Sequence, residues 1–248
     1  KEFIVDALGE EGLARSVVVV ATGDESPLLR VRAMAAAITA AEYFRDAGRD
    51  VMLMVDSITR FAQAQRQIGL AAGEQPATKG YTPSVFSLLP QLLERAGGME
   101  GGGSITGVYT VLVEGDDLTE PVADAAKGIL DGHVVLSRRM ANRGHFPAID
   151  PLESISRLAD QVSDDNHVTA RRRIMELLSA YRESEELISI GAYTKGSSPM
   201  TDVAIALKPA IDGFLKQARD ERTEFPVTCR TLCELAGESE RLRQSITG

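Results

Sequence analysis

Runs of apolar and polar positions divide the chain, up to about residue 160, into alternating strands and helices. The β-branched run over 16–22 is closed by Gly23 and has no polar face, so it is predicted to be a central strand of a parallel sheet. Ser26 followed by Pro27 is typical of a helix N-terminus, and this helix is expected to end near Gly48. Strands are further predicted over 51–55, 104–113 and 133–137, and helices over 58–70, 84–96 and 122–130. This alternation indicates a parallel sheet with helices on both faces.

The pattern changes after Asp164, where no strand-like run remains. Three amphipathic helices are predicted there, over 166–188, 200–218 and 228–243, and the turn-rich connector 191–199 separates the first two. The sequence therefore predicts an α/β domain with a mostly parallel sheet flanked by helices over residues 1–163. An all-helical domain is expected to follow over residues 164–248.

Charge and apolar content limit the classes of partner. No apolar run approaches the roughly 20 residues that cross a bilayer, and the first residues do not resemble a signal peptide, so we expect a cytoplasmic protein. The net charge of −9 repels a phosphate backbone and argues against nucleic acid as a partner. The arginines over 171–173 are expected to form a solvated helix face, and Cys229 and Cys233 to be core side chains.

Asp56 ends the apolar run 51–55, although an unpartnered buried carboxylate costs on the order of several kcal/mol. The carboxyl ends of parallel strands open onto the ligand crevice of an α/β sheet. One interpretation is therefore a carboxylate that holds hydrated Mg²⁺ beside a nucleoside triphosphate, the role called Walker B. The other is an N-cap for the helix that starts at Ser57. The stretch alone leaves both open.

A phosphate-binding loop of the form G-x-x-x-x-G-K-[ST] occurs nowhere in the 248 residues. The glycine-rich stretch 97–104 lacks the lysine, carries Glu100 and precedes a strand instead of opening a helix. It is therefore predicted to be a mobile loop and not a phosphate cradle.

The segment 143–157 ends the sheet pattern and carries two candidate residues. Arg157 suits bidentate contact with phosphate oxygens and could stabilise transferring phosphoryl charge in a neighbour's site. Composition alone favours an ion pair instead. The acidic residues near it in the sequence are Glu153, Asp160 and Asp164. Phe146 precedes a proline at a position where an aromatic ring could stack on a base, although a core phenylalanine is the commoner explanation.

Taken together, these segments resemble the hexameric protein-export ATPases of the bacterial flagellum and of type III secretion, relatives of the catalytic subunit of the rotary ATP synthase. The matching motifs follow one another in the expected order over nearly the whole chain. They are Val51-Met-Leu-Met-Val-Asp56-Ser-Ile-Thr-Arg60-Phe61, Gly80-Tyr-Thr-Pro-Ser-Val-Phe86, Leu92-Leu-Glu-Arg95, Gly115-Asp-Asp-Leu-Thr-Glu-Pro121, Val135-Leu-Ser-Arg138, Phe146-Pro-Ala-Ile-Asp-Pro151, Ser154-Ile-Ser-Arg157 and Ile190-Gly-Ala-Tyr-Thr-Lys-Gly-Ser-Ser-Pro199.

The resemblance implies a RecA-like domain that binds ATP and Mg²⁺, followed by a helical domain, in a ring of six subunits. By motif match, Asp56 would be the Walker B aspartate acting on Mg²⁺ through water, and Arg157 the arginine finger given to the adjacent subunit. Phe146 takes the place of the aromatic that packs on adenine. Arg60 follows Walker B as in the relatives and would link the magnesium side of the pocket to its neighbours.

The resemblance also implies partners: export-apparatus proteins, export chaperones and a stalk-like subunit. The segment from Tyr193 to Ser198 lies where the rotary relatives touch their central stalk, although its residues do not match their acidic loop. The expected location is the cytoplasm, with peripheral association at the inner membrane. Whether the apparatus is flagellar or an injection system is decided by overall similarity alone, which favours the flagellum.

Family members carry their phosphate loop and a catalytic glutamate on segments before the equivalent of Lys1. The sequence is therefore expected to be a C-terminal portion of such a protein. Two alternatives belong to other classes: a RecA-like RNA-dependent ATPase or helicase, and a non-catalytic module that assembles into a ring or binds partners. Acidic net charge and few aromatic residues give the RNA channel little support.

We expect the 248 residues alone to hydrolyse no ATP, because the groups that would polarise the phosphates and position the attacking water are not in this sequence. The measurement is phosphate release by the purified chain, with contaminating ATPases excluded. Turnover well above the background rate would contradict the expectation.

Overall fold

The computed structural model describes residues 3–247. Lys1, the reference point for the segments expected to precede this chain in family members, lies outside the described residues. The chain forms two compact units, Lys1–Leu130 and Asp131–Gly248, and each is described by itself. This division follows contacts within the chain and places residues 131–163 with the helical part. The domain boundary expected at 163/164 stays a prediction.

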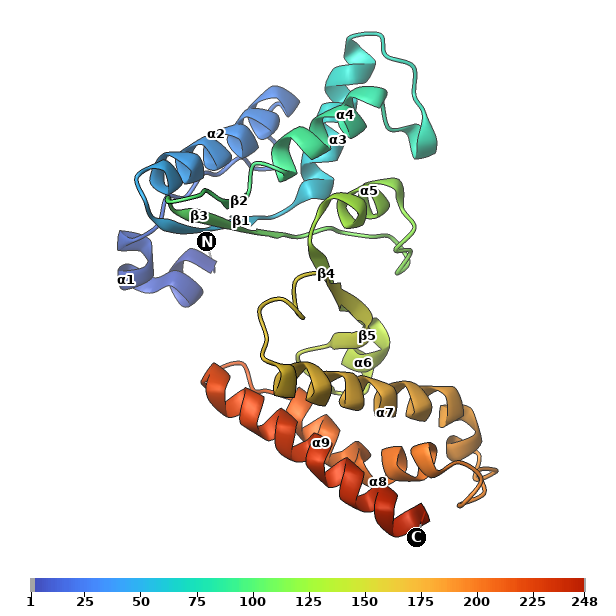
Figure 1. Ribbon diagram of the computed structural model, residues 1–248. Coiled ribbons are helices and arrows are strands. Elements are labelled where there is room, and N and C mark those ends of the chain that lie inside the picture. Colours follow the sequence, from blue (N-terminus) through green and yellow to red (C-terminus); the bar gives the residue numbers. More distant parts are fainter. Residues whose placement is uncertain (1–2, 248) are drawn as a thin grey trace. The chain divides into compact units, whose positions relative to one another are not determined.

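The first unit is built on the sheet order β1-β3-β2 (Figure 1). β1 (Asp50–Val55) runs parallel to β3 (Ser104–Tyr109) in continuous register. β2 (Gly97–Gly98) pairs antiparallel with the start of β3, so part of the expected glycine-rich loop is strand. Two of the strands predicted for a parallel sheet are therefore confirmed, and they pair in parallel.

Four α-helices cover one face of this sheet: α2 (Pro27–Asp46), α3 (Ile58–Ala71), α4 (Pro83–Leu93) and α5 (Pro121–Ile129) (Figure 1). The predicted start of α2 is confirmed, because the Ser26 hydroxyl accepts a hydrogen bond from the Leu29 backbone N–H at 3.3 Å. Helices and strands share one apolar core whose members include Ile38, Leu53, Ile58, Val85, Leu89, Ile105 and Val122. The unit also contains a π-helix over Phe3–Leu8, α1 (Gly9–Ala14) and a 3₁₀ turn over Thr78–Gly80.

The prediction of a central strand over 16–22 is wrong for this structure. These residues have no ladder partner among the described strands, and Val17 and Val20 are 61% and 69% exposed. The prediction of helices on both sheet faces also fails, because Met52 and Met54 of β1 are 68% and 56% exposed on the face opposite the core residue Leu53. A β-branched run forms a strand only where a neighbouring strand meets its backbone N–H and C=O groups.

The second unit opens with a two-stranded antiparallel sheet. β4 (Gly132–Leu136) and β5 (Ile149–Ser156) pair with a register shift between His133 and Val135, and the short helix α6 (Arg138–Asn142) lies in the connection. The strand predicted over 133–137 therefore exists, but it does not join the parallel sheet. β5 was not predicted, because its polar residues and Pro151 obscure the strand pattern.

Three helices complete the second unit and confirm the predicted helical region: α7 (Asp165–Ser189), α8 (Pro199–Leu215) and α9 (Phe225–Thr247) (Figure 1). Asp164 begins α7 by accepting a hydrogen bond from the His167 backbone N–H at 2.9 Å. Their shared core includes Ile174, Leu177, Val203, Leu207, Ile211 and Leu235. Within residues 3–247, no helix combines the length and apolar character needed to cross a membrane.

Arg173 corrects the expectation that residues 171–173 form a solvated face. Its side chain is only 9% exposed and donates to the Ser239 hydroxyl at 2.9 Å, while Arg171 and Arg172 both pair with Asp160. Arg173 lies three residues after Ala170 and four before Leu177, on the buried face of α7.

Leucine truncation on α7 tests where this unit is held together. Leu177→Ala removes a side chain with no exposed surface and is expected to cost about 2–5 kcal/mol of unfolding free energy. Leu187→Ala, at a 50% exposed position of the same helix, is expected to cost about 0.5 kcal/mol or less. Urea unfolding of the chain followed by circular dichroism measures both. Similar losses for the two variants would contradict this packing.

Candidate functional site

Asp56 lies where the carboxyl ends of β1 and β3 meet. Its exposed carboxylate accepts a hydrogen bond from the hydroxyl of Thr110, which directly follows β3, at 3.1 Å. The backbone continues the ladder at this point: the Thr110 N–H donates to the Val55 carbonyl, and the Ile58 N–H donates to the Thr110 carbonyl, each at 3.0 Å. The carboxylate is therefore oriented by the neighbouring strand and still faces outward.

The alternative in which Asp56 caps the next helix is wrong. Ser57 is the N-cap of α3, and its hydroxyl accepts a hydrogen bond from the Arg60 backbone N–H at 3.3 Å. Ser57 is buried, whereas Asp56, joined to it by a cis peptide bond, is exposed. A buried serine thus supplies the cap, and the adjacent carboxylate does not.

Arg60 belongs to the same strand-to-helix junction, in the first turn of α3, with an exposed side chain. Thr59 beside it is buried: its hydroxyl donates to the Leu112 carbonyl at 3.2 Å and accepts from the Leu112 N–H at 2.8 Å. These two bonds tie the first turn of α3 to the segment after β3. Asp56 and Arg60 are therefore presented by a junction that is fixed on both sides.

Phe146 lies in the turn between α6 and β5 of the second unit, and its side chain is 56% exposed. Its backbone carbonyl accepts from the Gln217 N–H at 3.0 Å, and the preceding His145 N–H donates to the Met140 carbonyl at 3.1 Å. The His145 ring is buried, and this burial lowers its pKa. A core role for Phe146 does not fit its exposure.

Arg157 directly follows β5 and is exposed, and its backbone N–H donates to the Asp131 carbonyl at 2.8 Å. The three carboxylates considered as its partners have contacts of their own. Glu153 pairs with Arg182, Asp160 pairs with Arg171 and Arg172, and Asp164 caps α7. Arg157 itself has interacting groups, so its exposure does not mean that its guanidinium is free.

The four candidate residues fall into two groups. Asp56 and Arg60 share the β1–α3 junction of the first unit. Phe146 and Arg157 belong to the second unit: Phe146 lies three residues before β5, and Arg157 directly follows it. Residues 150 to 155 of β5 lie opposite only residues 135 to 133 of β4, so β5 is not fully extended.

Sequence reasoning missed the groups that hold the candidates in place. Thr110 orients Asp56 across 54 residues, and Glu185 of α7 accepts hydrogen bonds from Arg139 and Arg143 across 46 and 42 residues. Nothing in the sequence near Thr110 or Glu185 indicates which distant side chain each of them contacts. Only the pairing of strands and the packing of α7 reveal them.

The segment 190–199 is an ordered turn held by Asp202, in the first turn of α8. The buried Asp202 carboxylate accepts from the Tyr193 hydroxyl at 3.0 Å and from the Gly196 N–H at 2.8 Å. Gly191 and Gly196 have positive φ of 72° and 91°, which other residues rarely adopt. Ile190, at the start of the segment, is 75% exposed.

Two family models match the chain in succession. Residues 1–156 match the ATP synthase alpha/beta family, nucleotide-binding domain, and residues 163–234 match the T3SS EscN ATPase C-terminal domain. The first match alone covers more than half of the chain.

Individual proteins agree with these models. The chain is 55% identical over 240 residues to the "Flagellum-specific ATP synthase" of Bacillus subtilis (strain 168), covering 97% of this chain and 55% of that protein. The assembled ATPase EscN from the enteropathogenic E. coli type III secretion system matches with a TM-score of 0.88 and 44% identity, over 92% of this chain and 55% of that one. EscN in complex with its central stalk EscO matches with a TM-score of 0.83 and 43% identity, over 92% and 54%.

The chain spans about half the length of the curated relative that it matches. Its α/β unit and helical region agree with the expected fold class, and the resemblance to export ATPases is confirmed. The chain therefore belongs to the ATP synthase alpha/beta nucleotide-binding family.

Proposed function

We propose that the protein hydrolyses ATP to energise protein export through the flagellar apparatus, as a ring-forming ATPase. The observation that carries the proposal is the exposed Asp56 carboxylate at the joined ends of β1 and β3, oriented by Thr110 and not used as a helix cap. This is the edge of a parallel sheet at which ligands bind. The relatives named above are by name a flagellum-specific ATP synthase and an ATPase of a type III secretion system, and the flagellar relative has the higher identity to this chain.

Mg²⁺ fits the residues at this edge. Among the described residues there is no cluster of three or more His, Cys, Asp or Glu side chains that could hold a metal. Mg²⁺ does not need one, since it keeps several waters and is held by one or two carboxylates together with substrate phosphates. When bound with ATP, the ion would neutralise phosphate charge, and Asp56 would hold it through water.

Phe146 and Arg60 have supporting roles in the proposal. The exposed Phe146 ring offers a face on which adenine packs, and its backbone is held by Gln217. Arg60, fixed beside Asp56 by the cap of α3, links the magnesium side of the pocket to neighbouring groups.

Arg157 acts in the proposal as an arginine finger on the nucleotide of the adjacent subunit. Its exposed position directly after β5, with its backbone N–H held by the Asp131 carbonyl, supports this arrangement. A guanidinium presented at a subunit boundary can stabilise the charge that develops during phosphoryl transfer.

The proposed partners follow from the same family. We infer a homohexamer, a central stalk subunit, export-apparatus proteins and export chaperones, in the cytoplasm with peripheral association at the inner membrane. EscN, a relative, was solved both assembled and in complex with a central stalk. The ordered turn 190–199 with exposed Ile190 is the proposed stalk contact. No observation on this chain favours an RNA-dependent ATPase, and its net charge of −9 opposes one.

Arg157→Ala in the full-length protein tests the proposal. Nucleotide binding is expected to stay within about twofold, while turnover falls by about 10³-fold or more, because the contact forms in the transition state. Equilibrium binding of ATP and steady-state phosphate release measure the two effects. Arg219→Ala, at another exposed arginine, is the control and should change neither. Equal loss of binding and turnover would assign Arg157 a structural role instead.

A further inference from the structure

Helix α7 presents two charged side chains, Arg182 and Glu185, to the segment that carries Phe146. They lie three residues apart and therefore on the same helix face. Each side chain holds a different part of the chain between Arg139 and Glu153. We call this pair the α7 clamp.

Arg182 holds the start of β5. Its Nη2 donates to both carboxylate oxygens of Asp150 at 2.7 Å, and its Nη1 donates to Glu153 at 3.1 Å. Asp150 is only 6% exposed in its side chain, and its Oδ1 also accepts from the Leu152 N–H at 3.0 Å. A carboxylate this buried is stabilised by its cationic partner, so the start of β5 is fixed to α7.

Glu185 holds the other side of the Phe146 turn. Its carboxylate accepts from Arg143 Nη1 at 2.5 Å and from Arg139 Nη1 at 3.2 Å. The side chain is 22% exposed, and the hydrogen bond from Arg143 is the main cause of the lowered pKa of Glu185. The carboxylate therefore stays charged and paired at neutral pH.

Between these two anchors, the turn is held by backbone hydrogen bonds. Arg143 lies three residues before Phe146, and Asp150 lies four residues after it. The bonds to Gln217 and Met140 fix the backbone of the turn at its centre, whereas the Phe146 ring itself is more than half exposed. The direction of this ring depends on how the flanking residues are held.

We propose that Glu185 is a positioning residue for the nucleotide site: through Arg143, it fixes the turn that presents the Phe146 ring to the base. The inference rests on the proposed role of Phe146 and adds a residue that contacts neither nucleotide nor reacting atoms. It also makes α7 the element through which the helical region acts on base binding.

A double-mutant cycle in the full-length protein tests this. Phe146→Ala is expected to raise the KM for ATP about tenfold, the order that loss of an aromatic stack gives. Glu185→Gln keeps the shape of the side chain but loses its charge, and is expected to raise KM about threefold with kcat within about twofold. In the Phe146→Ala background, Glu185→Gln should cause no further rise, because the ring that it positions is gone.

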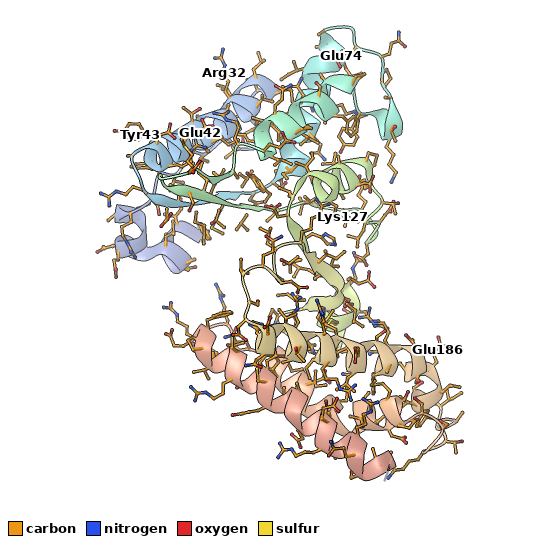
Figure 2. All side chains as sticks on the ribbon, in the orientation of Figure 1. Arg32, Glu42, Tyr43, Glu74, Lys127 and Glu186 are labelled. Atoms are coloured by element: carbon orange, nitrogen blue, oxygen red, sulfur yellow. The ribbon has the colours of Figure 1, made fainter. Side chains whose placement is uncertain are left out.

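Two further variants serve as controls. Glu186→Gln changes the next residue of α7, which is exposed (Figure 2), and should leave KM unchanged. Glu185→Asp retains the charge and should recover part of the lost affinity. Thermal unfolding of each variant shows whether the fold is intact.

The outcomes separate the two claims. If Phe146→Ala leaves KM unchanged, the proposed contact of Phe146 with the base is wrong, and the proposed positioning role of Glu185 is wrong as well. If Phe146→Ala raises KM but Glu185→Gln does not, the base contact stands and the positioning role of Glu185 is overturned. A full additional rise from Glu185→Gln in the Phe146→Ala background also overturns it, because that is the result of a merely structural role.

Discussion

The parallel pairing of β1 with β3 is the interaction on which the candidate site depends. It brings the ends of two strands, 54 residues apart in the chain, to one point, where the Thr110 hydroxyl meets the Asp56 carboxylate. The apolar sides of the same strands, through Leu53 and Ile105, carry the core on which four helices pack. Burial on one face thus fixes the position of a charged group at the strand ends. The buried Ser57 then begins α3 and leaves the carboxylate outside.

The second unit adds charged contacts between its small sheet and α7 to the apolar core of its helices. β4 and β5 form a sheet too small to hold itself, and isolated two-stranded sheets are marginal in water. Arg182 and Glu185 of α7 meet opposite charges on both sides of the Phe146 turn. The helical region therefore also supports the small sheet, because Arg182 of its longest helix pairs with Asp150 of the strand that leads to Arg157.

Local signals in the sequence were sufficient for β1 and α3, which carry Asp56 and Arg60, but not for β5, which leads to Arg157. The apolar run before Asp56, the Ser26 cap and the periodicity of the last three helices each predict a feature that the structure contains. The strand prediction over 16–22 failed because apolar character indicates that a segment tends to be buried, but it does not indicate which element would cover it. Arg173 was missed although helical periodicity places it between Ala170 and Leu177 on the buried face. The contacts made by Thr110 and Glu185 span tens of residues and have no local signal.

The central claim is that Asp56 of one subunit and Arg157 of the next serve the same nucleotide. Mixing two inactive full-length variants, Asp56→Asn and Arg157→Ala, in equal amounts tests it most directly. In mixed rings, some boundaries join an intact Asp56 from one variant to an intact Arg157 from the other, so ATP turnover is predicted to rise well above that of either variant alone. A mixture no more active than its components, under conditions where mixed rings are shown to form, would contradict the account, because it would place both residues in the site of one subunit.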